Sequence, residues 1–130
     1  MYRAPWAKSA DTIEFCQLLD NIVINYNNIV ITGDFNIPNW NNDTAVKLGD
    51  GQIIRNFANE HNLLQIAKSA TRKLSYLDLI FVSSRFQQCH VIDIEPLAGS
   101  DHSAQLLYLP NSGYVIASQP LTYVINYEQL

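Results

Sequence analysis

The stretch VITGDFNIPNW, residues 30–40, decides how the rest of the chain is interpreted. Residues 29–32 predict a short buried strand, because β-branched side chains fit a pleated, covered surface. Gly33 interrupts this run, and Asp34 and Asn36 follow where the strand ends. A carboxylate and an amide at the mouth of a sheet are typical of the sites of α/β proteins. The alternative is an Asx-type turn after the strand, which the stretch favours when it is taken alone.

Length and composition exclude several classes of protein. The 130 residues suffice for one domain with a hydrophobic core, and 48% hydrophobic with 15% charged residues is typical of a globular protein. The net charge of −4 argues against a broad nucleic-acid footprint, although a nuclease can bind through a local patch and a metal ion. No apolar run approaches a membrane span, so we expect no membrane partner. Cys16 and Cys89 form no C-x-x-C pair, which fits an intracellular, reducing compartment.

Hydrophobic periodicity predicts two helices, residues 11–24 and 52–62. Asp11 and Glu14 at the start of the first helix suggest a capping box. The predicted strands cover residues 29–32, 63–66, 74–83, 89–94 and 104–109, with a loop at 39–51 and a turn at 98–100. The tail from Gly113 stays unassigned. Helices among several strands indicate an α/β or α+β architecture built around sheets.

Two further stretches place polar side chains at or near strand ends. In SYLDLIFV, residues 75–82, Asp78 interrupts a hydrophobic strand and shares a face with Ile80. A carboxylate there is costly to bury unless it is paired, and a solvent-facing charge on an edge strand is an equally good interpretation. In GSDHSAQLLYL, Asp101 and His102 close a turn before the next strand, where a surface pair is the commoner outcome.

Together the three stretches specify one chemistry. Mg²⁺ prefers carboxylate oxygens and takes only one or two from the protein, which suits Asp34 and Asp101. Asn36 can donate to a phosphate oxygen through its amide. An imidazole held by a carboxylate is the usual arrangement for proton transfer or charge stabilisation, which suits Asp78 and His102. The combination predicts metal-assisted cleavage of a phosphodiester.

The same three stretches, in this order, resemble the motifs of the endonuclease/exonuclease/phosphatase superfamily. The segments are GDFN at 33–36, SYLDLIFVS at 75–83 and GSDHSAQLLYL at 99–109, and YRAPW at 2–6 resembles the Tyr-x-x-Pro stretch of that superfamily. The continuations GDFNIPNW and ATRKLSYLDLIFVS are most similar to the endonuclease domains of non-LTR retrotransposon endonuclease–reverse transcriptase proteins. The resemblance implies a DNase-like four-layer α/β sandwich, with two mainly antiparallel sheets flanked by helices. It also implies Mg²⁺ or Mn²⁺ as cofactor and DNA as substrate.

The resemblance assigns roles to five residues. Asp34 and Asn36 would position and activate the attacking water and hold the scissile phosphate. Asp101 would share the metal with Asp34 or orient His102, and Asp78 would fix the His102 imidazole. Which carboxylate acts as the base stays open.

The chain departs from the superfamily in one respect. It resembles the C-terminal half of the domain over residues 1–130, without the half that supplies an early Asn and the principal metal-binding Glu. Glu14, Glu60 and Glu95 do not lie in the corresponding motif. We therefore expect weak metal binding and little or no activity of this fragment alone.

A missing half would also leave an exposed sheet face and edge, which favours self-association. A non-catalytic remnant or interaction module that keeps the fold is the alternative function. An unrelated α/β binding domain with coincidental Asp and His placement is a third and weaker one. Location in the nucleus is expected only from the retroelement analogy.

Overall fold

The computed structural model of the chain describes residues 1–37, 39–41, 49–96 and 99–109. Its helices are α1 (Ser9–Val23), α3 (Asp50–Glu60) and the short 3₁₀ helix η1 (Ser84–Phe86). Its strands are β1 (Val30–Asp34), β2 (Leu63–Gln65), β3 (Asp78–Ser83), β4 (His90–Ile94) and β5 (Ala104–Tyr108). None of the described helices is both long and apolar enough to cross a bilayer. The α/β class expected from the sequence is confirmed.

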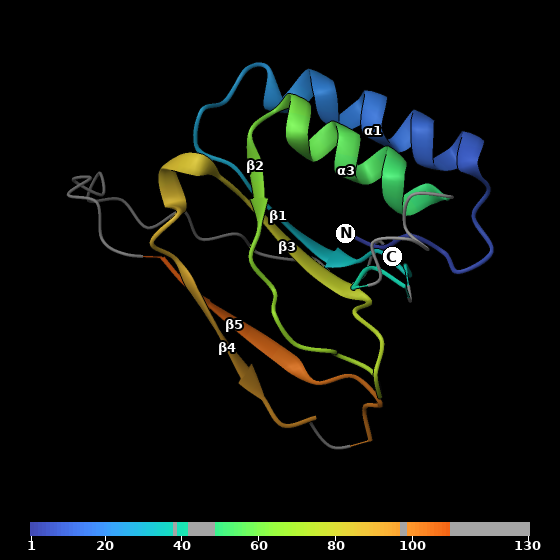
Figure 1. The fold of residues 1–130 in the computed structure, drawn as a ribbon, viewed down its shortest axis with the longest axis vertical. Helices are drawn as coiled ribbons and strands as arrows, with labels where there is room; N and C mark the ends of the chain where they lie inside the picture. The colour runs from blue at the N-terminus through green and yellow to red at the C-terminus, as the bar shows by residue number, and fades with distance from the viewer. Residues whose placement is uncertain (38, 42–48, 97–98, 110–130) are drawn as a thin grey trace, which may run out of the picture.

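The strands form two antiparallel sheets. One sheet has the order β1-β3-β2, and the other is the β4–β5 pair. Helices α1 and α3 lie side by side over one face of the three-stranded sheet, and the β4–β5 pair lies on its opposite side (Figure 1). The described residues therefore form three layers, helix, sheet and sheet.

The alternation of β3 explains these layers. Leu79 and Phe81 pack in the core beneath the two helices, whereas Ile80 and Val82 pack against Val91 and other residues of the second sheet. Both faces of β3 are covered, which is why the strand is apolar from Leu79 to Val82 with no polar alternation. Asp78 shares the face of Ile80 and so belongs on the side of the second sheet.

The helix start at the predicted capping box differs from expectation. Helix α1 begins at Ser9, with Lys8 as its N-cap residue. The Asp11 carboxylate accepts a hydrogen bond from the Lys8 backbone N–H at 2.8 Å, so Asp11 is the third helical residue and does not cap the helix itself. The box of Asp11 and Glu14 was therefore wrong. An acidic side chain in the first turn satisfies an unpaired N–H equally well from this position.

Strand β3 is shorter than predicted because a tight turn occupies residues 71–75. The Thr71 N–H donates to the Ser75 carbonyl at 3.0 Å, and the Ser75 N–H donates to the Arg72 carbonyl at 2.9 Å. Lys73 has φ 54°, in the left-handed region that turns require. These bonds prevent Leu74 from joining the ladder. The tail from Gly113 lies outside the described residues.

Candidate functional site

The end of β1 is held by backbone pairing on both sides. The Asp34 N–H donates to the Met1 carbonyl at 3.1 Å, and the Arg3 N–H donates to the Asp34 carbonyl at 2.8 Å. A Cβ on Gly33 would lie 2.0 Å from the Met1 carbonyl oxygen. Only glycine permits this approach of two backbone segments. Gly33, the first residue of the GDFN motif, therefore helps to fix the position of Asp34.

Phe35 anchors the same strand end in the core. Its side chain is 1% exposed and meets the Phe81 ring edge-to-face, with centroids 5.3 Å apart. Its N–H donates to the Leu77 carbonyl at 2.7 Å. Burying this ring leaves its neighbours Asp34 and Asn36 at the half-buried rim of the sheet.

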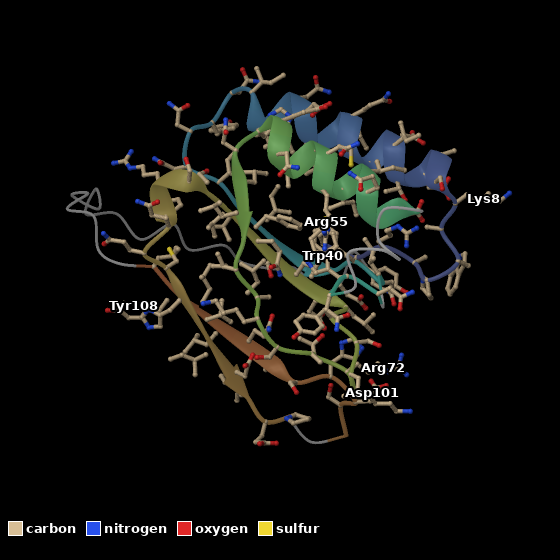
Figure 2. The ribbon with its side chains drawn as sticks, viewed as in Figure 1. Lys8, Trp40, Arg55, Arg72, Asp101 and Tyr108 are labelled. Atoms are coloured by element: carbon tan, nitrogen blue, oxygen red, sulfur yellow. The ribbon has the colours of Figure 1, made fainter. Side chains whose placement is uncertain are left out.

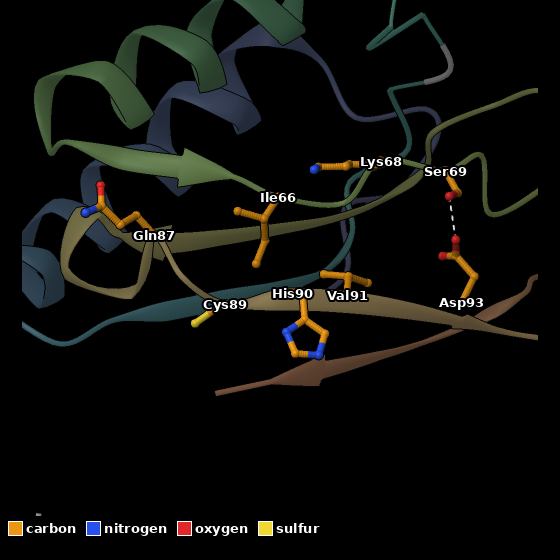
Figure 3. Close-up of a pocket in the computed structure, with 8 residues that line it drawn as sticks. All are labelled: Ile66, Lys68, Ser69, Gln87, Cys89, His90, Val91 and Asp93. Carbon is orange, nitrogen blue, oxygen red and sulfur yellow. Dashed lines mark hydrogen bonds between the residues drawn. The ribbon is translucent and has the colours of Figure 1, made fainter. Parts of the chain in front are cut away.

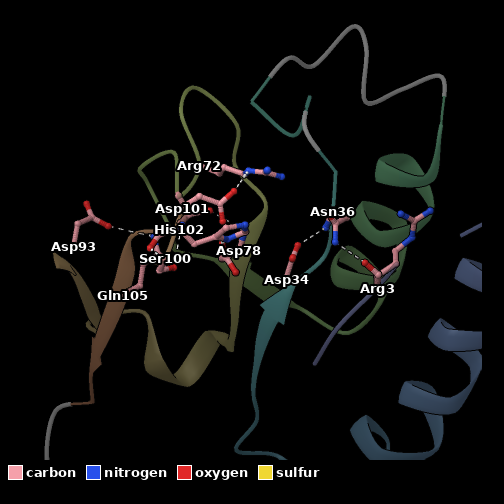
Figure 4. A network of polar contacts seen from close by, with 11 residues as sticks. Arg3, Asp34, Asn36, Arg72, Asp78, Asp93, Ser100, Asp101, His102 and Gln105 are labelled. Carbon is pink, nitrogen blue, oxygen red and sulfur yellow. Dashed lines mark hydrogen bonds and ion pairs between the residues drawn. The ribbon is translucent and has the colours of Figure 1, made fainter. Parts of the chain in front are cut away.

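Asn36 completes the turn that follows. Its backbone has φ 48°, a left-handed conformation that asparagine tolerates. Its N–H donates to Asp34 Oδ1 at 2.9 Å, and its side-chain Nδ2 donates to the Arg3 carbonyl at 2.7 Å (Figure 4). The Asx-type turn considered for the sequence is therefore present. It does not preclude a site, because each carboxylate oxygen can accept more than one bond and the amide has a second hydrogen.

Three of the predicted side chains meet at this rim. Asp34 lies directly opposite Asp78 in the antiparallel register of β1 and β3. His102 Nδ1 lies 2.7 Å from Asp78 Oδ2, and one ligand atom from each residue falls within 4.8 Å of the others (Figure 4). Two carboxylates opposite one another repel. A cation between them, or a charged imidazole, relieves that repulsion, so the geometry suits a divalent metal.

Thr71 joins strand β3, which begins at Asp78, to the turn before β5 that carries His102, and nothing in the sequence singled it out. Its side chain is 2% exposed, and its Oγ1 accepts the Asp78 N–H at 3.1 Å. Its carbonyl accepts the Ser103 N–H at 2.8 Å. Ser100 Oγ also accepts the His102 N–H at 3.1 Å. The only sequence signal for Thr71 was a hydroxyl residue beside a basic turn, which is common on protein surfaces.

Asp101, predicted as a metal ligand, is not in the cluster formed by the described residues. Its carboxylate forms an ion pair with Arg72 Nε at 2.7 Å, and its side chain is 65% exposed. Figure 2 shows the two residues side by side at the outer end of the molecule. Asp101 and His102 are adjacent in a turn, and the imidazole is committed to Asp78. The neighbouring carboxylate is thereby directed to Arg72.

A small pocket between the two sheets is separate from this rim (Figure 3). Its lining includes Lys68, Ser69, His90 and Asp93, none of which belongs to the cluster. Ser69 Oγ donates to Asp93 Oδ2, so these two polar groups satisfy one another. The rim of β1 and β3 is the better candidate for chemistry.

A carboxylate pair with a carboxylate-bound imidazole, at the edge of a two-sheet α/β scaffold, is a side-chain set that metal-assisted hydrolases use. The family model described as endonuclease-reverse transcriptase matches residues 1–106, which include every candidate residue discussed here. The chain belongs to this endonuclease-reverse transcriptase family. The resemblance to retroelement endonucleases is thereby confirmed. No curated protein and no solved structure matched the chain.

Proposed function

We propose that the chain carries a Mg²⁺- or Mn²⁺-dependent phosphodiesterase site of the endonuclease type, with DNA as its substrate. One observation supports this above the others, the convergence of Asp34, Asp78 and His102 ligand atoms within 4.8 Å. Membership of the endonuclease-reverse transcriptase family supports a nuclease-type function and a nucleic-acid substrate.

We assign a distinct role to each side chain of the proposed site. Asp34 binds the cation, and a bound Mg²⁺ or Mn²⁺ would supply Lewis acidity at the scissile phosphate. Asp78 orients the His102 ring through Nδ1, which leaves Nε2 for a water molecule or a phosphate oxygen. Asn36 keeps one amide hydrogen for a phosphate oxygen, because it donates the other to the Arg3 carbonyl.

The predicted metal role of Asp101 remains a prediction. Its ion pair with Arg72 would have to break before the carboxylate reached the cluster. Among the described residues the cluster then holds two carboxylates and one imidazole. We propose that so small a donor set binds metal weakly and turns over little DNA. The small number of ligands also favours the alternative function, a non-catalytic module that keeps the fold.

We also propose that this three-layer arrangement is the C-terminal half of a four-layer sandwich. The outer face of the β4–β5 pair supports the proposal. It carries the cross-strand pair Ile92 and Leu106, and the Tyr108 ring stacked on His90. Ile92, Leu106 and Tyr108 are each more than 40% exposed. An apolar face of this kind calls for a further covering layer. When nothing covers it, copies of the chain would associate through it.

Metal binding is the direct test of the site. We expect Mn²⁺ to broaden the amide NMR signals around Asp34, Asp78 and His102 before all others in the full chain. Asp34→Asn and His102→Ala should each remove this selective broadening. Asp93→Asn is the matched control, because Asp93 is an exposed carboxylate outside the cluster. Equal broadening at carboxylates across the surface would contradict the proposal.

Activity is tested separately by plasmid nicking in Mg²⁺. We expect little or no nicking by the pure chain. Nicking that His102→Ala abolishes would support the nuclease site and overturn the proposal of weak activity. Selective metal binding without any nicking would favour the non-catalytic module.

A further inference from the structure

A shallow groove lies between α1 and α3, lined by residues of both helices. The two helices lie side by side (Figure 1). Each helix lines it with positions spaced i, i+3, i+4 and i+7, which form one stripe on a helix. The apolar part of the lining comprises Ile13, Cys16, Ile53 and Phe57. Ile13 is 47% exposed and Ile53 is partly exposed, whereas Cys16 and Phe57 are buried beneath them.

The rim of the groove is acidic. Asp20 and Glu60 line it from the ends of the two helices. One oxygen of Asp20, Oδ1, lies 2.6 Å from His61 Nε2, so Glu60 is the more available of the two carboxylates. Helix α1 carries three acidic and no basic residues, and α3 carries two acidic residues and Arg55. Arg55 lies over the Trp40 ring, at 4.8 Å from its centroid, and donates to the Trp40 carbonyl (Figure 2). The only cation of either helix is therefore engaged elsewhere.

The thiol in the floor of the groove reports the same negative surroundings. Burial first, and then the nearby carboxylates of Asp20 and Glu60, raise the pKa of Cys16 to about 11. The part of this shift that comes from the two carboxylates reflects a negative potential, which attracts a cation at the rim. The groove is therefore complementary to a ligand that presents apolar side chains flanked by cationic ones.

We propose that the α1–α3 groove binds a basic amphipathic helix of a partner protein. Apolar side chains at i, i+3 or i+4, and i+7 of that helix would lie on Ile13 and Ile53, above the buried Phe57. Lysine or arginine residues beside that stripe would pair with Glu60 and with the second carboxylate oxygen of Asp20. This site is independent of the candidate metal cluster, which lies at the ends of β1 and β3.

Other occupants fit this groove less well. Nucleic acid is repelled by the acidic rim, because its phosphates carry like charge. A second copy of the chain would bring an equally acidic pair of helices to a twofold contact, so that like charges would face each other. Charge complementarity therefore selects a basic polypeptide.

The test uses the full chain and two synthetic helical peptides of the same apolar pattern. One peptide carries lysine at its polar positions and the other carries glutamate. We expect the lysine peptide to shift the NMR signals of the groove residues saturably, and the glutamate peptide to shift none. Binding of both peptides, or of neither, would overturn the proposal. Shifts that map to the Asp34 rim would also overturn it.

Matched variants separate the groove from general electrostatics. Glu60→Lys should weaken the lysine peptide roughly tenfold, whereas Glu95→Lys, the same charge change at an exposed residue outside the groove, should leave binding within about twofold. Ile13→Ser should also weaken binding, and Leu18→Ser, at an exposed leucine that does not line the groove, should not. Equal effects of the two charge variants, or of the two serine variants, would refute the assignment.

Discussion

The most informative single change is Thr71→Val, because Thr71 bonds both to Asp78 and to Ser103, the neighbour of His102. Valine keeps the shape of the side chain and removes only the acceptor of the Asp78 N–H bond. A buried N–H left without a partner costs about 1–3 kcal/mol. Asp78 is half-buried, so water compensates part of the loss, and we expect about 1–2 kcal/mol in the free energy of unfolding.

Ser83→Ala provides a matched control at the other end of β3. Ser83 Oγ accepts the Ile29 N–H at 2.8 Å, so the variant deletes the same kind of bond roughly 17 Å from Asp78 along the strand. Urea unfolding should show comparable losses for the two variants with unchanged m-values. Only Thr71→Val should change the NMR signals of the His102 ring and weaken Mn²⁺ binding, roughly tenfold for the loss of a supporting group.

Two results would refute this reasoning. Parent-like stability of Thr71→Val would mean that its hydroxyl bond contributes nothing. An equal effect of Ser83→Ala on the His102 ring would mean that the pair responds to general loosening of β3. The ring signals report this even where Mn²⁺ binding is too weak to measure.

Three further outcomes are expected. Gly33→Ala should lower the free energy of unfolding, measured in urea, by more than about 1 kcal/mol, because the added Cβ would collide with the Met1 backbone. Parent-like stability would contradict the close approach of these two backbone segments. Cys16 should react with a thiol reagent at pH 8 more slowly than Cys89 does. The pKa of Cys16 is raised to about 11 and its side chain is buried, whereas Cys89 is only partly buried. Faster labelling of Cys16 would show that the structure around this thiol opens. Sedimentation velocity should detect self-association that Leu106→Glu reduces, and a monomer at all concentrations would exclude an interface on the β4–β5 face.

Much of the site was predictable because it depends on strand order and alternation. A β-branched run ending in GDFN places Asp34 at a strand end, and alternation within the run around Asp78 assigns its carboxylate to one face of the predicted strand. Antiparallel pairing then brings the two carboxylates together. The Asp-His pair before β5 supplied the imidazole without any periodic signal.

The parts that were missed depend on turns, where a side chain's direction follows from a few dihedral angles. The φ of 54° at Lys73 shortened β3 and brought Thr71 under Asp78. The turn before β5 directed His102 to Asp78 and Asp101 to Arg72. Neighbouring residues in a turn show no periodic pattern. The sequence can therefore indicate that both Asp101 and His102 are candidates, but not which of them points toward Asp78.

The register that sets Asp34 against Asp78 also bears on how the sheet reaches its native pairing. A slip of one residue would turn every side chain of a strand to the opposite face and separate the two carboxylates. Only the correctly aligned chain would then retain its full affinity for a divalent ion, so the ion would stabilise that alignment over its misaligned competitors. Adding Mn²⁺ during refolding would on this basis raise the yield of correctly paired protein, and the effect would disappear in Asp34→Asn.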